Sequence, residues 1–169
     1  MSVDALISHL NACGEQDFVS KLGTVYEHSP WIAQAVRPAR PFRDRHALHA
    51  AMQDVVLDAP EAAQLALIRA HPDLAGKLAR AGALEAHSTG EQKGLGLDRL
   101  SDHEYERFDS LNTAYRTRFG FPFIIAARAH TRETVLSEFT RRLQNSPAVE
   151  RATALDEIGK IALFRILDL

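Results

Sequence analysis

The stretch between residues 100 and 120 constrains the fold more than any other part of this 169-residue chain. Ser101 and Glu104 have the spacing of a capping box, in which each side chain accepts a hydrogen bond from a backbone N–H at a helix start. The apolar residues that follow recur every three or four positions, which places them on one face of a helix. Gly120 then stands where the pattern stops, and glycine is typical of helix C-termini. We therefore predict an amphipathic helix to about residue 119, with the apolar stripe Tyr105, Phe108, Leu111, Tyr115 and Phe119.

The rest of the chain is also predicted to be helical. Alternation of β-branched and polar residues, the usual sign of a half-buried strand, is almost absent. We therefore predict an all-α fold, a single-domain multi-helix bundle over residues 1–169. Residues 83–100 are expected to be irregular apart from one helical turn near Glu91. Further helices are predicted at about residues 3–11, 15–22, 30–36, 44–57, 60–70, Pro72 to Gly82, 131–143 and 148–169.

One apolar run lacks helical periodicity. The residues from Phe121 to Ala127 form a short apolar run, and the chain offers no second strand to pair with it. We therefore predict that the part of the chain near residues 120–128 is a buried irregular segment, extended or turn-like, rather than a strand.

Composition and charge exclude several kinds of partner. The chain has 20 Lys and Arg and 22 Asp and Glu, a net charge of −2, without long runs of one sign. We therefore expect neither nucleic acid nor a membrane surface as a partner. The first ten residues lack the features of a signal peptide, and no stretch approaches the roughly 20 apolar residues of a membrane span. The expected location is the cytoplasm.

No metal site is expected from the sequence. Cys13 is the single cysteine, so neither an intrachain disulfide nor a cysteine-based zinc site is predicted. His46 and His49 are three residues apart and would share a helix face, but no HExxH motif, third ligand or acidic cluster accompanies them.

His71 is the first candidate for a functional role. It stands directly before Pro72, and a residue in that position is disfavoured in the α conformation, so we predict that His71 lies outside a helix. Pro72 in turn suits the first position of a following helix. An imidazole at a helix entrance is well suited to proton transfer near neutral pH. The alternative is a turn histidine that only caps that helix, and the residues alone leave both open.

Two polar residues interrupt apolar helix faces. Arg165 falls in the middle of the apolar sector of the last predicted helix, and an unpaired charge there would be very costly. It therefore either reaches the rim or a structural carboxylate, or lines a pocket and binds the carboxylate of a ligand. Asn112 lies among the stripe residues of the helix that ends near 119, and we expect its amide to bond to the backbone of a neighbouring segment.

The segment from Ser88 to Gln92 also permits two interpretations. Ser88 and Glu91 have capping-box spacing, in which case the Glu91 carboxylate bonds to a backbone N–H and has no catalytic role. In the other interpretation, Glu91 and Gln92 present a carboxylate and an amide to a ligand from a glycine-flanked loop. The pattern alone does not choose between them.

Several motifs, taken together and in order, resemble the OHCU decarboxylase family. Members of this family act on 2-oxo-4-hydroxy-4-carboxy-5-ureidoimidazoline (OHCU), an intermediate between urate and (S)-allantoin. The resemblance covers nearly the whole chain, with one small departure at Leu95, where alanine is expected. The motifs are Tyr26 to Trp31, Arg40-Pro41-Phe42, His71 to Lys77, Ser88-x-x-Glu91-Gln92, Gly96-Leu97-Asp98 and Tyr115 to Ile124.

The resemblance implies an all-α decarboxylase that needs no cofactor and no metal, is usually a homodimer and acts on a small ureide. Its catalytic histidine, glutamate and arginine correspond to His71, Glu91 and Arg165. We expect His71 to deliver a proton, Glu91 to orient the substrate and Arg165 to compensate negative charge. Substrate contacts are implied for Pro72, Ser88, Thr89, Gly90, Glu91, Gln92, Phe121, Phe123, Ile124, Ile125, Ala126 and Ala127.

Two other classes of function compete with this hypothesis. An all-α interaction module would bind a partner helix in an aromatic groove, but it gives no reason for Arg165 on an apolar face. A hydrolase would use His71 and Glu91 as an acid–base pair, but it would normally need a metal or nucleophile that the sequence does not offer. The groove of the first alternative comprises Trp31, Phe108, Phe119 and Phe121.

Overall fold

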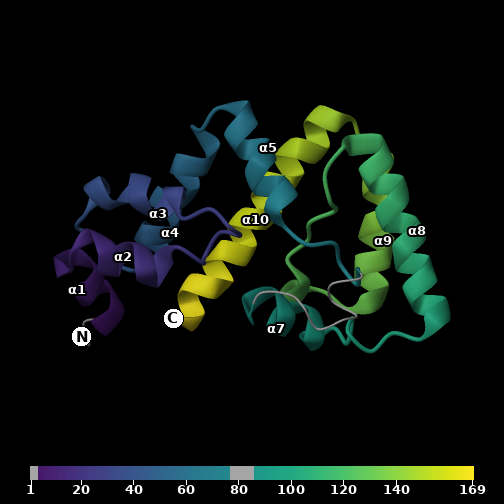
Figure 1. Cartoon of the computed structure of the whole chain (residues 1–169), viewed down its shortest axis with the longest axis horizontal. Helices are drawn as coiled ribbons and strands as arrows, with labels where there is room; N and C mark the ends of the chain where they lie inside the picture. The colour runs from purple at the N-terminus through teal and green to yellow at the C-terminus, as the bar shows by residue number, and fades with distance from the viewer. Residues whose placement is uncertain (1–3, 77–85) are drawn as a thin grey trace. The chain divides into compact units, whose positions relative to one another are not determined.

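A computed structural model describes residues 4–76 and 86–169, and within these residues the chain is helical or irregular, without strands. The predicted all-α fold is therefore confirmed. The chain divides into two compact units (Figure 1), and the boundary between them falls within two of the helices. Unit 1 comprises Met1–Leu67 and Gly159–Leu169, and unit 2 comprises Ile68–Ile158. The single domain over residues 1–169 stays a prediction.

Unit 1 is built from short helices that begin at side-chain caps. The Asp4 carboxylate accepts a hydrogen bond from Leu6 N–H, and the Asp44 carboxylate accepts one from Ala47 N–H, so each satisfies a backbone donor at a helix start. Arg45 donates to Asp4 and to the Ile166 carbonyl. The elements are α1 (Ala5–Ala12), α2 (Glu15–Leu22), α3 (Trp31–Val36), η1 (Arg37–Ala39), α4 (Arg45–Leu57), most of α5 (Glu61–Ala70) and the end of α10 (Pro147–Asp168).

Unit 2 contains the helix that the sequence predicts most strongly. In α8 (Asp102–Phe119), the capping box is present: Ser101 Oγ accepts from Glu104 N–H at 3.2 Å, and Glu104 Oε1 accepts from Ser101 N–H at 3.2 Å. Gly120 ends the helix with φ +76°, a left-handed conformation that glycine adopts without steric cost. The other elements are α7 (Ala86–Gly94), η2 (Ala127–Ala129), α9 (Arg132–Arg142) and the first part of α10.

An aromatic cluster forms the core of unit 2. In Figure 1, α8 and α9 run side by side, and the ring of Tyr115 on α8 lies 6.0 Å from the ring of Phe139 on α9. The centroid of the Phe123 ring lies 3.8 Å from that of Phe139 and 5.4 Å from that of Tyr115. Tyr115, at the centre of the C-terminal half of α8, thus packs against both α9 and the segment that follows Gly120.

The predicted buried irregular segment is confirmed. Residues 121–126 have no regular structure, and every one of them is buried. Buried backbone N–H and C=O groups need hydrogen-bond partners, and in a sheet a neighbouring strand would supply them. Here charged side chains supply two of them. Arg142 Nη1 donates to the Ile124 carbonyl at 2.6 Å, and Ala126 N–H donates to Glu157 Oε2 at 2.8 Å.

Two local predictions are wrong. Residues 72–76 form a turn rather than the start of a helix, and the remainder of the helix predicted up to Gly82 lies outside the described residues. Residues 86–94, expected to be irregular apart from one helical turn near Glu91, form the helix α7. Helix propensity there is low, but Ser88 and Gln92, one turn apart, are both buried, which indicates that packing stabilises α7.

Candidate functional site

His71 lies just beyond the end of α5, as predicted, and is 6% exposed. Its backbone N–H donates to the Ile68 carbonyl at 3.2 Å, which closes the last turn of the helix. No helix begins at Pro72 within residues 72–76, so the interpretation of His71 as a cap for such a helix is wrong. We call residues 71–76 the His71 turn.

The side chain of Gln92, on α7, bonds to both ends of the peptide stretch that follows Pro72. Its Oε1 accepts from Ala75 N–H at 2.9 Å, and its Nε2 donates to the Asp73 carbonyl at 3.2 Å. Ala75 has φ +52°, a left-handed conformation that is uncommon for a residue with a Cβ. The Gln92 amide therefore stabilises a strained backbone directly after His71 and Pro72.

Helix α8 contributes two more contacts to the His71 turn. Asn112 Nδ2 donates to the Leu74 carbonyl at 2.8 Å, and Asn112 is 5% exposed. Arg116 Nε donates to the Asp73 carboxylate at 2.9 Å. The expected bond of Asn112 to neighbouring backbone is confirmed, and the turn that carries His71 is thereby fixed to two helices.

Asn112→Asp is expected to lower the free energy of unfolding by about 2 kcal/mol, because a carboxylate cannot donate to the Leu74 carbonyl and is buried beside it. Urea unfolding followed by circular dichroism measures the change. Gln144→Glu makes the same amide-to-carboxylate change at an exposed position of unit 2 and serves as the control. If both variants have the same urea midpoint of unfolding as the wild type, the bond from Asn112 does not stabilise the His71 turn.

Both sequence interpretations of Ser88 to Gln92 need correction. Helix α7 begins at Ala86, so Ser88 is inside the helix and does not cap it. For the same reason, Glu91 and Gln92 belong to a helix and not to a glycine-flanked loop. Ser88 and Gln92 are each 4% exposed, and Glu91 is half-buried. Gly90 is exposed, whereas the side chain of Thr89 lies outside the described atoms.

Arg165 belongs to unit 1 and is buried, with 2% exposure. Its Nη1 donates to the Val25 carbonyl at 3.2 Å, and its Nη2 donates to Glu27 Oε1 at 3.4 Å. Glu27 is 1% exposed. Arg165 therefore has a carboxylate partner, and its role in binding a substrate stays a prediction. Glu27 is a residue that sequence reasoning did not identify.

A second buried charge pair supports the irregular segment, and sequence reasoning missed it. Arg142 Nε donates to Glu150 Oε1 at 2.8 Å, and both residues are at most 1% exposed. Tyr115 Oη donates to the same carboxylate at 2.6 Å, and the Arg142 guanidinium lies 4.3 Å from the centre of the Phe123 ring. Burial, followed by the hydrogen bond to Glu150, raises the pKa of Tyr115, so the phenol keeps its proton and donates it. A signal existed, because Arg142 continues the spacing of the apolar residues Val135 and Phe139 on α9.

Most of the predicted site residues belong to unit 2. His71, Pro72, the segment 88–92 and the segment 121–127 all lie in it, whereas Arg165 belongs to unit 1. Within the segment 121–127, the Ile124 carbonyl and the Ala126 N–H already bond to Arg142 and Glu157.

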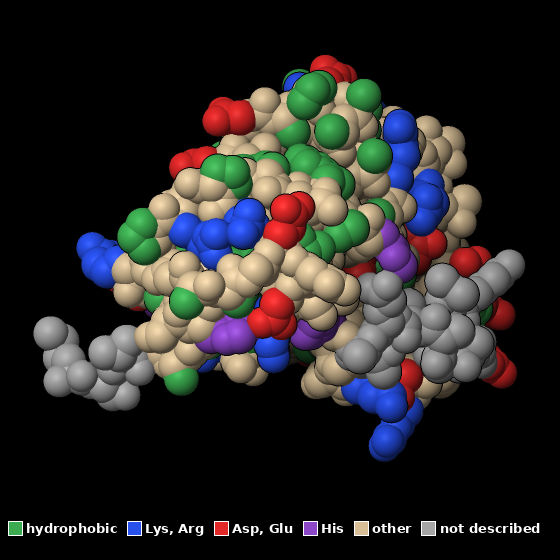
Figure 2. All heavy atoms as spheres, turned by 60° about the vertical axis from the view of Figure 1, so that its left-hand side comes forward, with side chains coloured by type: hydrophobic (Ala, Val, Ile, Leu, Met, Phe, Trp, Pro, Cys, Tyr) green, Lys and Arg blue, Asp and Glu red, His purple; other side chains and the backbone are tan. Residues whose placement is uncertain are grey.

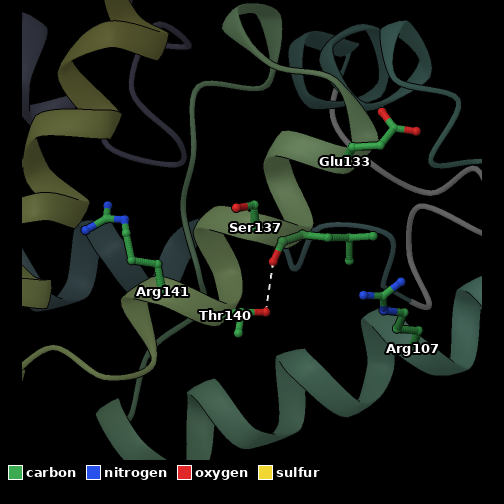
Figure 3. A pocket seen from close by; sticks show the side chains of 6 residues that line it. Arg107, Glu133, Ser137, Thr140 and Arg141 are labelled. Atoms are coloured by element: carbon green, nitrogen blue, oxygen red, sulfur yellow. Dashed lines mark hydrogen bonds between the residues drawn. The ribbon is translucent and has the colours of Figure 1, made fainter.

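Unit 2 also has a surface groove of about 560 Å³, which Figure 3 shows from close by. None of the predicted site residues lines it. Thr140 Oγ1 donates to the carbonyl of Leu136 in the same helix, so this hydroxyl is already engaged (Figure 3). The lining residues are Arg107, Glu133, Leu136, Ser137, Thr140 and Arg141.

His49, on α4, bonds to the backbone of α10 within unit 1. His49 Nε2 lies 2.7 Å from the Gly159 carbonyl, to which it must donate. Burial lowers the pKa of His49, because the charged form is disfavoured away from water.

Among the described helices, none is both long enough and apolar enough to cross a bilayer. On the face that Figure 2 shows, basic and acidic side chains are interspersed rather than gathered by sign.

Comparison with known proteins identifies relatives over nearly the whole chain. A family model described as "OHCU decarboxylase" matches residues 11–167. The chain is 41% identical over 160 residues to 2-oxo-4-hydroxy-4-carboxy-5-ureidoimidazoline decarboxylase of Amia calva, covering 95% of this chain and 91% of that protein. It is 40% identical over 162 residues to the protein of the same name from Haloferax volcanii, covering 96% and 94%. A crystal structure of (S)-allantoin synthase matches with a TM-score of 0.76 and 34% identity, over 96% of this chain and 53% of that chain.

Proposed function

This chain belongs to the OHCU decarboxylase family, and we propose that His71, Glu91 and Arg165 carry out its chemistry. The chain is a carboxy-lyase that converts 2-oxo-4-hydroxy-4-carboxy-5-ureidoimidazoline to (S)-allantoin and CO2 in urate degradation. The observation that carries this conclusion is the match to the family over residues 11–167. It favours the decarboxylase over the interaction module and the hydrolase.

Decarboxylation leaves behind the electron pair of the broken C–C bond, which must be delocalised, and the product then needs one proton. The substrate carboxylate sits on a carbon that also bears a hydroxyl and adjoins a ring C=N bond. When the bond to the carboxylate breaks, CO2 leaves and the electron pair moves into the conjugated ring. The hydroxyl-bearing carbon then becomes a carbonyl carbon as its hydroxyl loses a proton. The neighbouring ring carbon, which bears the ureido group, must be protonated on one face to give a single enantiomer.

In this proposal, His71 delivers that proton. Its support is the rigidity of the His71 turn, which Gln92 and Asn112 bond to α7 and α8. A proton donor fixed in this way reaches one face of a bound planar intermediate and not the other, and enzymes rely on such positioning for selectivity.

Glu91 and Arg165 have supporting roles in the proposal. The Glu91 carboxylate accepts hydrogen bonds from the hydroxyl or ureido N–H groups and so orients the substrate. The Arg165 guanidinium compensates the negative charge of the substrate as it redistributes in the transition state. Burial of Arg165 supports this role, because a cation away from water acts on nearby charge with less screening.

The remaining substrate contacts follow from the buried irregular segment. We include backbone groups of residues 123–127 as partners of the ureido and ring amides, and Phe121 as a ring that packs on the substrate. Arg142 and Glu157 support this part of the proposal, because their bonds to the Ile124 carbonyl and the Ala126 N–H hold the backbone of the segment in one conformation. The other proposed contacts are Pro72, Ser88, Thr89, Gly90, Glu91 and Gln92.

A cytoplasmic homodimer completes the proposal. Its support is the resemblance to the family, whose members are usually dimeric. Light scattering on the purified protein measures the mass of the assembly, and a monomer at all concentrations would contradict this part.

An assay of the product by circular dichroism tests the function. The substrate is generated in situ from urate, and allantoin is followed with and without the protein. Spontaneous decay of the intermediate gives racemic allantoin, whereas the protein is expected to accelerate the decay and to give an excess of the S form. If it does neither, the chain is not an OHCU decarboxylase.

A further inference from the structure

Three side chains with metal-ligating atoms meet where α1 is joined to α2. His9 lies in the last turn of α1, Cys13 is the C-terminal cap of that helix, and Asp17 lies in the first turn of α2. The imidazole nitrogen, the sulfur and the carboxylate oxygen all lie within 4.8 Å of one another. His9 Nε2 is 2.5 Å from Asp17 Oδ2. Each of the three residues is four positions from the next in the sequence. Because the chain bends between the two helices, the sequence alone does not predict that all three side chains converge.

The backbone that carries these side chains is held in place by the segment 40–42. Arg40 Nη1 donates to the Leu10 carbonyl at 3.1 Å and to the Cys13 carbonyl at 2.9 Å. The Asn11 side chain donates to the Phe42 carbonyl and accepts from the Phe42 N–H, each at 2.8 Å. An ion that binds here therefore needs to order side chains only, and the entropic cost of forming the site is small.

The donor set has the chemistry of a zinc site. Imidazole nitrogen, thiolate sulfur and carboxylate oxygen are the three ligand types that Zn²⁺ takes in proteins, at about 2.0–2.3 Å. A thiolate and a carboxylate together carry two negative charges, which balance those of the ion. With three protein ligands, a water molecule fills the fourth tetrahedral position.

The site is open to an incoming ion. The side chains of His9 and Asp17 are 46% and 47% exposed, and Cys13 is half-buried. Binding replaces the hydrogen bond between His9 and Asp17, and the weak contact of the Cys13 thiol with the Leu10 carbonyl at 3.7 Å, by metal–ligand bonds. Both lost interactions are at the surface or weak, so the exchange favours the ion.

We propose that His9, Cys13 and Asp17 form a binding site for a divalent transition-metal ion with the preferences of Zn²⁺. The bound ion connects α1 to α2 and stabilises unit 1. The site contains none of the residues to which the decarboxylation is assigned, so it is independent of the proposed mechanism.

Titration of the full-length protein with Co²⁺ tests the site, because a thiolate bound to Co²⁺ gives a charge-transfer band in the near ultraviolet. The wild type is expected to develop this band with one equivalent of Co²⁺ and to lose it when Zn²⁺ is added. Cys13→Ser is expected to abolish the band. His9→Ala and Asp17→Asn should each weaken Co²⁺ binding by at least about tenfold, the loss typical even of an outer-shell partner.

His46→Ala is the matched control, because His46 is an exposed histidine of the same unit and has no part in the site. It should bind Co²⁺ like the wild type. The far-ultraviolet circular dichroism of each variant, recorded without metal, should equal that of the wild type, so that lost binding is not lost folding. A wild type that shows no Cys13-dependent band, or His9→Ala and Asp17→Asn variants that bind as the wild type does, would overturn the proposal.

Discussion

His71→Ala is expected to lower the decarboxylation rate by about a hundredfold to ten-thousandfold, which is the contribution typical of a positioned general acid. The product should also change, because the remaining reaction proceeds without a donor fixed on one face. Allantoin formed in the presence of the variant is therefore expected to approach a racemic mixture. Circular dichroism of the product in the in-situ assay measures the rate and the enantiomeric excess together.

The control separates the role of His71 from a general effect of losing a histidine. His103→Ala removes an exposed histidine of the same unit and should leave rate and enantiomeric excess unchanged. The backbone bonds from Gln92 and Asn112 to the His71 turn do not involve the imidazole, so His71→Ala should remain folded. A His71→Ala variant that keeps the S excess would assign the proton to another group.

Arg165→Met is expected to lower the free energy of unfolding by about 3–5 kcal/mol, because it leaves the Glu27 carboxylate buried without its cation. The double variant Glu27→Gln/Arg165→Met removes both charges and should regain most of that stability, since a buried ion pair replaced by neutral groups is often near neutral. Urea unfolding of the wild type, both single variants and the double variant gives the coupling between the two residues.

The same four proteins distinguish the structural role of Arg165 from its proposed catalytic role. If the guanidinium compensates substrate charge, the double variant is folded but slow. A stable double variant with wild-type activity would leave Arg165 a structural role alone. The pair Arg141 and Glu138, whose side chains are 60% and 32% exposed, is the control. Glu138→Gln/Arg141→Met should change stability little, because solvent screens this pair.

The features predicted correctly from the sequence depend on residues close together in the chain. The start of α8 is set by the reciprocal bonds of Ser101 and Glu104, three residues apart, and its end by the left-handed conformation of Gly120. The irregular segment was predictable because an apolar run without a second strand has no regular pairing available. Arg165 and Asn112 were identified as interruptions of apolar faces, although their partners were not.

The features predicted wrongly depend on distant residues. Pro72 favours a helix start locally, but the Ala75 N–H bonds to Gln92, 17 positions away, and the chain turns instead. The residues of α7 have low helix propensity, and burial of Ser88 and Gln92 favours the helix nonetheless. Arg142 interrupts an apolar face as Arg165 does, and only the folded chain brings Glu150 to it as a partner.

The sequence by itself therefore determined most of the helices, and the residue types suited to proton transfer and to binding an anion. These follow from backbone preferences and side-chain periodicity within a few residues. The tertiary structure alone decided which partners these groups have. Arg165 bonds to Glu27 across 138 positions of the chain, and the Leu74 carbonyl accepts from Asn112 across 38. Such pairs form because a buried charge or carbonyl needs a partner, and only the folded chain specifies which side chain is within reach.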